Sequence, residues 1–190
     1  MALESTVKNM FMSLTVICLV CSALLGGAYA ITKDKIDQAG VDKQNEAIAR
    51  VVPEFDNVPS EEMFEVELEG KKYTVYPASL SGETVGYAIN ASATGFSGPV
   101  VIMVGITADG RIFNTVPVSH AETPGLGAKI SEEGNAFVAQ FEGLDPSATV
   151  LKVRKDGGDI DAITASTITS RAYTAAVETA WLVFNKIKEM

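Results

Sequence analysis

The stretch VVIMVGITADGRIFNTVPV at residues 100–118 decides the fold. It holds two runs rich in Val and Ile, residues 100–107 and 112–118, on either side of Ala108-Asp109-Gly110. Val and Ile favour extended backbone, and Asp-Gly between two such runs is a strong turn signal. The stretch therefore predicts a β-hairpin, which is a pair of antiparallel strands.

Segments on both sides of this hairpin extend the pattern. Strand-like runs occur at residues 64–68, 73–76, 84–90 and 149–153, and helix-like runs at residues 32–52, 135–141 and 170–188. In the last helix-like run the apolar positions recur at helical spacing, which is typical of packing against a core. The order of helices and hairpins predicts an α+β domain with a mainly antiparallel sheet and flanking helices.

The N-terminal part of the chain is apolar. Residues 10–31 contain 22 consecutive positions without a charge, and about 20 apolar residues span a bilayer as a helix. A cleaved signal peptide is the alternative, because Ala28-Tyr29-Ala30 has the form of a cleavage site. We favour a retained anchor, since the run is longer than the apolar part of most signal peptides. The sequence predicts a short tail at residues 1–9, a transmembrane helix at residues 10–31 and one domain at residues 32–190.

The charge of the chain excludes some classes of partner. The formal net charge is −9. Residues 1–31 contain only two charged residues, Glu4 and Lys8, whose charges cancel, so the predicted domain carries the whole net charge. Such a domain is not expected to bind nucleic acid or anionic lipid, because phosphate contacts need Lys and Arg. Both cysteines, Cys18 and Cys21, fall in the predicted membrane helix, where we interpret them as small apolar residues.

A loop with two glycines follows the hairpin and reads Glu122-Thr123-Pro124-Gly125-Leu126-Gly127. Glycine lets the backbone approach a ligand closely, and successive N–H groups in such a loop can bind an anion or the edge of a flavin ring. The alternative is a tight turn into the next helix. His120 is the only histidine and cannot form a metal site alone, and no catalytic triad is evident.

A second candidate site is the run Asp161-Ala-Ile-Thr164-Ala165-Ser166-Thr167-Ile-Thr169-Ser170 ahead of the last helix. One hydroxyl suffices to cap a helix, and this run has five. A helix N-terminus also offers unpaired N–H donors and a partial positive charge, which suit a phosphate group. The run is therefore either a cluster of capping residues or a phosphate site, and a threonine hydroxyl there could also be esterified by phosphate.

This run resembles the attachment motif of the FMN-binding domain found in the G subunit of the Rnf complex and in the C subunit of the sodium-translocating NADH:quinone reductase. That motif usually reads as an acid, then Ser/Thr-Gly-Ala-Thr and further hydroxyls. Asp161, Thr164 and Thr167 match it, whereas Ala165 stands for Gly and Ser166 for Ala. Residues 95–112 and 120–127 also look like this family, and the resemblance covers about residues 10–190.

The resemblance implies that FMN is joined through its phosphate to Thr167. The other residues expected at the cofactor are Thr164, Ala165, Ser166 and Thr169 in the motif and Glu122, Thr123, Gly125, Leu126 and Gly127 in the loop. A separate flavin transferase would make the phosphoester from FAD. The domain would lie on the extracytoplasmic side of the cytoplasmic membrane and exchange electrons with other membrane and peripheral subunits, without a complete active site of its own.

The compact length favours the G subunit of the Rnf complex, an ion-translocating ferredoxin:NAD oxidoreductase, over the generally longer C subunit of the quinone reductase. A hypothesis from another class is a non-redox, membrane-anchored binding or scaffold domain with an unmodified helix cap. Detection of covalently bound flavin would distinguish the redox subunit from the non-redox domain.

Overall fold

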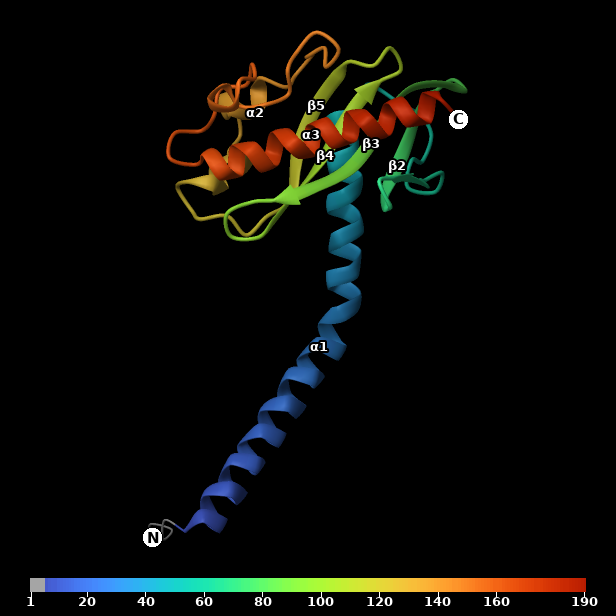
Figure 1. The fold of residues 1–190 in the computed structure, drawn as a ribbon. Coiled ribbons are helices and arrows are strands. Elements are labelled where there is room, and N and C mark those ends of the chain that lie inside the picture. The colour runs from blue at the N-terminus through green and yellow to red at the C-terminus, as the bar shows by residue number, and fades with distance from the viewer. Residues whose placement is uncertain (1–5) are drawn as a thin grey trace. The chain divides into compact units, whose positions relative to one another are not determined.

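The computed structural model describes residues 6–190. Its elements are α1 (Val7–Val51), β1 (Phe64–Leu68), β2 (Lys71–Leu80), β3 (Glu83–Thr94), β4 (Pro99–Thr107), β5 (Ile112–Ser119), the 3-10 turn η1 (Gly127–Ser131), α2 (Ala136–Ala139), the 3-10 turn η2 (Arg154–Asp156) and α3 (Thr167–Lys188). They are drawn in Figure 1. The chain divides into two compact units, one ending at Asp42 and the other spanning Lys43–Met190.

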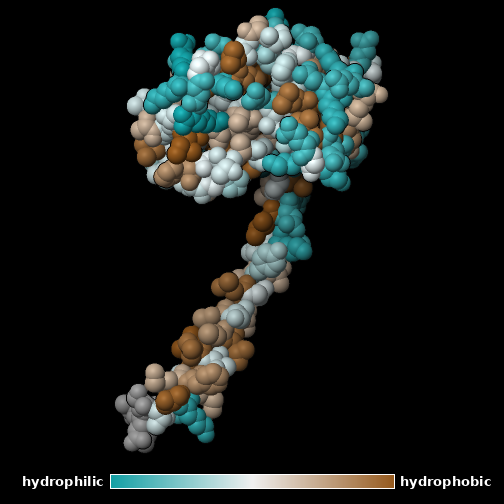
Figure 2. Space-filling view, viewed as in Figure 1, coloured by the Kyte–Doolittle hydropathy of each residue, from teal (hydrophilic) through white to brown (hydrophobic). Residues whose placement is uncertain are grey.

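Helix α1 is one continuous helix of 45 residues that contains both helical segments predicted at residues 10–31 and 32–52. Its most apolar window has a mean hydropathy of 2.2, and no part of that window counts as buried inside the protein. Figure 2 shows these apolar side chains in brown along the N-terminal part of the helix. By length and composition, α1 can cross a membrane. Of the predicted tail, residues 1–5 lie outside the described part of the chain and residues 7–9 belong to α1.

The five strands form one antiparallel sheet in the order β1-β2-β3-β4-β5, so neighbours in the sheet are also neighbours in the sequence. Two-residue turns connect the first three strands, and Glu69, Gly70, Ser81 and Gly82 all have positive φ there. Turns of this kind match the right-handed twist of antiparallel strands. The predicted antiparallel sheet of an α+β domain is confirmed.

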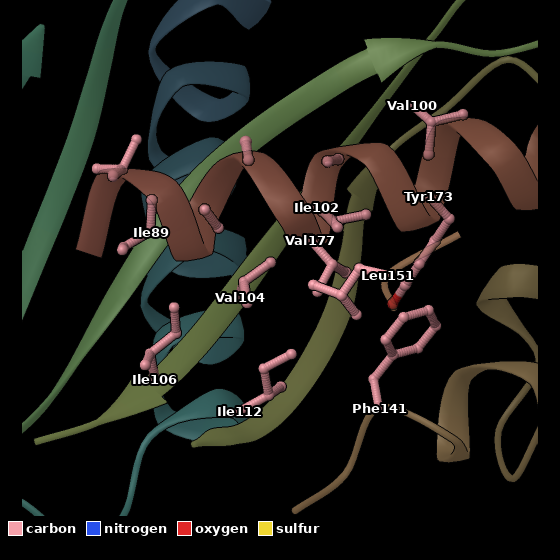
Figure 3. Packing of buried hydrophobic residues seen from close by; sticks show 14 of the residues in the cluster. Ile89, Val100, Ile102, Val104, Ile106, Ile112, Phe141, Leu151, Tyr173 and Val177 are labelled. Carbon is pink, nitrogen blue, oxygen red and sulfur yellow. The ribbon is translucent and has the colours of Figure 1, made fainter. Parts of the chain in front are cut away.

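Helix α3 packs across one face of this sheet, as Figure 1 shows in red. Strand β4 presents the alternate residues Val100, Ile102, Val104 and Ile106 to that face, and all four are fully buried. Val177 of α3 points toward these strand residues in Figure 3. Burying one such aliphatic side chain stabilises the fold by about 1.5–3 kcal/mol. Most of the buried apolar side chains lie on this face, so it forms the main core.

Tyr173 of α3 extends the core toward the candidate site. Its ring packs on those of Phe137 and Phe141, with centroids 5.3 and 5.4 Å away. Its hydroxyl donates a hydrogen bond of 2.9 Å to Thr115 Oγ1 of β5. Burial raises the pKa of the Tyr173 phenol, so the group stays neutral and keeps this bond. The first turns of α3 are therefore fixed against the sheet.

The last residues of α1 pack on the opposite face of the sheet. Ile48 and Val51 are buried there together with Met103 of β4. A Cβ atom at Gly105 would lie 1.5 Å from the Val51 carbonyl oxygen. Only glycine fits at this point of β4, because the backbone of α1 touches the strand directly.

Two predicted elements differ from the structure. The strand predicted at residues 149–153 is wrong, because only an isolated bridge between Val153 and Ile160 forms. The Val150 N–H donates instead to Asp159 Oδ2 at 2.8 Å, so a side chain takes the place of a partner strand. Helix α3 begins at Thr167 rather than near residue 170. The threonine named as the attachment point is thus the first residue of the helix.

Candidate functional site

Two segments that lie far apart in the sequence line most of one cavity, and Phe96 of the β3–β4 turn completes the lining. The two segments are the loop after β5, residues 122–127, and the start of α3. The cavity has a volume of about 320 Å³ and is lined by Phe96, Glu122, Thr123, Leu126, Gly127, Ala165, Ser166, Thr167, Ile168 and Thr169. Eight of the ten predicted cofactor-binding residues are among these, and pockets for small molecules begin at roughly 300 Å³.

Glu122 is a buried acid between the two segments, with only 5% of its surface exposed. Its Oε2 accepts a hydrogen bond from Thr169 Oγ1 of α3. Its Oε1 accepts one from the Ser97 N–H at 3.0 Å. A buried carboxylate needs such donors, and here they tie the loop to α3 and to the β3–β4 turn.

Glycines on both sides of Glu122 leave room for its side chain. A Cβ atom at Gly95 would lie 2.5 Å from Glu122 Oε1. A Cβ atom at Gly127 would lie 2.6 Å from Glu122 Oε2 and 2.5 Å from Thr169 Oγ1. The second glycine of the loop is therefore required by packing, whereas Gly125 has a φ of +72° and an open surrounding.

A tight turn precedes α3. Ala165 has a φ of +62°, in the left-handed region that glycine adopts most easily. The Ser166 N–H donates to the Ile163 carbonyl at 3.0 Å. Ser170 closes the turn, because its Oγ accepts from the Ile163 N–H at 2.9 Å and donates to the Ser166 carbonyl at 3.0 Å. The motif thus has a geometric reason for glycine at position 165, and this chain places alanine there.

Capping does not account for the hydroxyls of this run. Ser166 occupies the N-cap position of α3, yet its side chain makes no capping hydrogen bond. Its Oγ is buried and has no hydrogen-bond partner. Thr169 bonds Glu122 and Ser170 bonds the turn. The interpretation as a simple cluster of helix caps is therefore wrong for Ser166, Thr169 and Ser170.

Thr167 lies at the edge of the cavity with a cation beside it. Lys155 Nζ of η2 is 3.5 Å from Thr167 Oγ1. One turn further along α3, Arg171 forms two hydrogen bonds of 2.6 Å with the Asp156 carboxylate. This ion pair lowers the pKa of Asp156, since the guanidinium favours the charged carboxylate. The Asp156 carboxylate is thus hydrogen-bonded to Arg171, and the Lys155 ammonium lies beside the Thr167 hydroxyl.

Apolar side chains surround the mouth of the cavity. Phe96, Leu126 and Ile168 expose 68%, 43% and 46% of their surface. Exposed apolar side chains that gather around a cavity are available for contact with a ligand. Sequence reasoning missed Phe96, Ile168 and Lys155. Phe96 lies in a stretch that resembles the family, but nothing in its local pattern indicated that it would reach this loop.

Two predicted residues lie outside the cavity. Thr164 lines a separate surface depression beside α2, and Gly125 is exposed at the tip of the loop. Within the loop, the Thr123 carbonyl accepts from the N–H groups of Leu126 and Ala128 at 3.2 and 3.1 Å. These two N–H groups stabilise the loop itself. Among residues 6–190, no three His, Cys, Asp or Glu side chains are grouped to hold a metal ion.

Known proteins resemble the chain in sequence over nearly its whole length. The model of the FMN-binding domain matches residues 95–181, which include both cavity-lining segments. The G subunit of the ion-translocating oxidoreductase complex of Shewanella piezotolerans is 33% identical over 98% of this chain and 92% of its own length. The G subunit of the proton-translocating ferredoxin:NAD(+) oxidoreductase complex of Clostridium ljungdahlii is 32% identical over 88% of this chain and 86% of its own.

A solved structure supports the same fold. The C subunit of the Na(+)-translocating NADH-quinone reductase of Parabacteroides distasonis superposes with a TM-score of 0.55 at 22% identity, over 82% of this chain and 94% of that one. At this identity the likeness concerns the fold alone. From the sequence matches, the chain belongs to the family of G subunits of ion-translocating oxidoreductase complexes and contains the FMN-binding domain.

Proposed function

We propose that this chain is the electron-transfer subunit of an Rnf-type ferredoxin:NAD oxidoreductase complex and carries FMN joined by a phosphoester to Thr167 Oγ1. The observation that carries the proposal is the cavity shared by residues 122–127 and 165–169, with Thr167 at its edge. Bound FMN supplies the electron-transfer chemistry, and the protein supplies position and electrostatics.

The cavity fits part of such a cofactor. Its volume of about 320 Å³ holds a fraction of a large ligand and leaves the remainder at the surface. The exposed side chains of Phe96, Leu126 and Ile168 offer apolar contact to an aromatic ring system. The bond between Glu122 and Thr169 holds the two walls of the cavity at a fixed separation.

The surroundings of Thr167 suit a phosphate group. Thr167 is the first residue of a 22-residue helix whose first turn contains no acidic residue. The N–H groups and dipole at a helix N-terminus stabilise a nearby anion by about 0.3–1 kcal/mol. Lys155 Nζ, 3.5 Å from Thr167 Oγ1, adds a positive charge on the other side.

A separate flavin transferase would carry out the attachment. FAD would be the donor. The Thr167 hydroxyl oxygen forms the new bond to the FMN phosphorus, the pyrophosphate bond of FAD breaks, AMP leaves and the hydroxyl proton is released. The role of the chain in this step is to present Thr167 at the start of α3.

Helix α1 supports a membrane-anchored complex. It is long and apolar enough to span the bilayer. We place residues 32–190 on the extracytoplasmic side, where a covalent bond keeps the flavin from diffusing away. The electron donors and acceptors would be other membrane and peripheral subunits of the complex. The relatives are named as subunits of oxidoreductase complexes, which supports the presence of such partners.

Flavin fluorescence of a denatured band tests the proposal. The full chain is produced with a flavin transferase and run on a denaturing gel. Wild type should fluoresce and Thr167→Val should not. Thr164→Val is the matched control, because Thr164 lies in the same run but outside the cavity, and it should retain the fluorescence. A dark wild-type band, or a fluorescent Thr167→Val band, would show that the covalent site is assigned wrongly.

A further inference from the structure

Ser166 Oγ differs from the other hydroxyls of the run at residues 161–170 because it is buried and has no hydrogen-bond partner. Ser166 is 6% exposed, and its Oγ makes no hydrogen bond. Among residues 6–190 it is the one buried side-chain nitrogen or oxygen in this state. Native proteins pair nearly all such atoms, because leaving one unpaired is costly. The hydrogen-bond partner of Ser166 Oγ would therefore come from outside the polypeptide.

The rest of Ser166 is fully used by the turn. Its N–H donates to the Ile163 carbonyl, and its carbonyl accepts from the N–H and the Oγ of Ser170, each at 3.0 Å. The backbone of Ser166 is therefore fixed, and only its side chain has unused bonding capacity. A serine hydroxyl can both donate and accept, and it turns among staggered rotamers about one bond.

Ser166 also lines the cavity at the N-terminus of α3, next to Thr167. Two features thus meet here. One is the start of a 22-residue helix, where the first N–H groups have no partner within the helix, and the other is a buried hydroxyl without a partner. Both call for a polar ligand in the same place. The motif that this run resembles usually has alanine at this position, whereas this chain has serine.

We propose that the Ser166 hydroxyl forms a hydrogen bond with the FMN attached at Thr167, and that Ser166 is therefore a cofactor-positioning residue. The proposal rests on the proposed function. It predicts opposite effects of Ser166→Ala in the two forms of the protein. Without flavin the change removes an unpaired buried hydroxyl, and with flavin it removes a bond to the cofactor.

The experiment compares melting temperatures of four full-length proteins in detergent. Wild type and Ser166→Ala are each prepared with flavin transferase and without it. Ser166→Ala should raise the Tm of the flavin-free form by about 2–4 °C and lower that of the flavinylated form by a similar amount. Equal shifts in the two forms would overturn the proposal, because a bound water or a purely structural role acts alike in both.

Ser170→Ala is the matched control. Ser170 is a buried serine of the same run, but its hydroxyl already has two partners in the turn. Its removal should lower the Tm of both forms equally. The denaturing gel separates the two ways of failing. A dark wild-type band refutes the proposed covalent site and this inference with it, whereas a fluorescent band with equal Tm shifts refutes this inference alone.

Discussion

Thr169 Oγ1 donates a hydrogen bond to Glu122 Oε2, and this bond joins residues 47 positions apart in the sequence. Both side chains are buried. The bond connects the loop after β5 to the first turn of α3, which are the two walls of the candidate cofactor cavity. A change to either side chain therefore acts on both walls at once.

The bond between Glu122 and Thr169 should contribute measurably to stability. Thr169→Val keeps the shape but removes the donor, and we expect a loss of about 1.5–3 kcal/mol, the usual range for a hydrogen bond to a charged group. Denaturant unfolding of Thr169→Val, Glu122→Gln and the double variant gives the coupling between the side chains. Additive losses would mean that the two residues stabilise the fold independently. Exposed Thr164→Val should change stability by less than about 0.5 kcal/mol.

Gly127 should tolerate no side chain. Gly127→Ala places a Cβ 2.5 Å from Thr169 Oγ1 and 2.6 Å from Glu122 Oε2. Forcing these atoms apart should cost about 1–3 kcal/mol and lower the yield of fluorescent protein. Gly125→Asn is the control, because Gly125 has open space around it and asparagine tolerates its positive φ. If both variants behave alike, the loop needs flexibility rather than space beside Glu122.

Ala165→Gly should stabilise the protein. Ala165 has a φ of +62°, and an L-residue in that region carries a penalty of roughly 1–2 kcal/mol. Glycine removes the penalty but loses more backbone entropy on folding, about 0.5–1 kcal/mol. We therefore expect a net gain below about 1.5 kcal/mol in denaturant unfolding, with flavin attachment at least as high as in wild type. A loss of stability would indicate that the turn is unstrained.

Lys155 should favour the phosphate at Thr167. Its ammonium lies 3.5 Å from the threonine oxygen but is exposed to solvent. An exposed ion pair contributes about 0.2–1 kcal/mol, so Lys155→Met should slow flavin attachment by roughly one-and-a-half- to fivefold. Lys155→Arg should be nearly as fast as wild type, and Lys152→Met is the control for a lysine of the same surface. A Lys155→Met rate that equals wild type at low salt would remove Lys155 from the site.

The ion pair between Asp156 and Arg171 should give an acid-dependent stability. Arg171 lowers the pKa of Asp156 from its ordinary value of 3.8. Because the folded pKa is depressed, the stabilisation is present above pH 3.8 and is lost as the pH falls through the folded pKa. Wild type and Asp156→Asn should thus differ in stability at neutral pH and converge below pH 3.8. A difference that is constant with pH would rule out the carboxylate as its source.

Much of the fold followed from local patterns in the sequence. The Val- and Ile-rich runs around Ala108-Asp109-Gly110 specify a hairpin, because Val and Ile favour extended backbone and Asp-Gly permits the turn. The charge-free run at residues 10–31 likewise specifies an apolar helix by its length and composition. The run at residues 149–153 shows the limit of such reasoning. Its apolar residues have no neighbouring strand, and the presence of a partner is a property of the tertiary fold.

The sequence alone also indicated most of the candidate site, since the hydroxyl-rich run and the two-glycine loop are local patterns, but it did not indicate Phe96, Ile168 or Lys155. Only the tertiary structure decided what each residue does. It paired Glu122 with Thr169, placed Lys155 beside Thr167, and left Ser166 Oγ without a partner. These contacts join residues from different segments, and the packing of α3 on the sheet brings them together. A sequence pattern records which groups are available, whereas a hydrogen bond also requires that two of them come within about 3 Å.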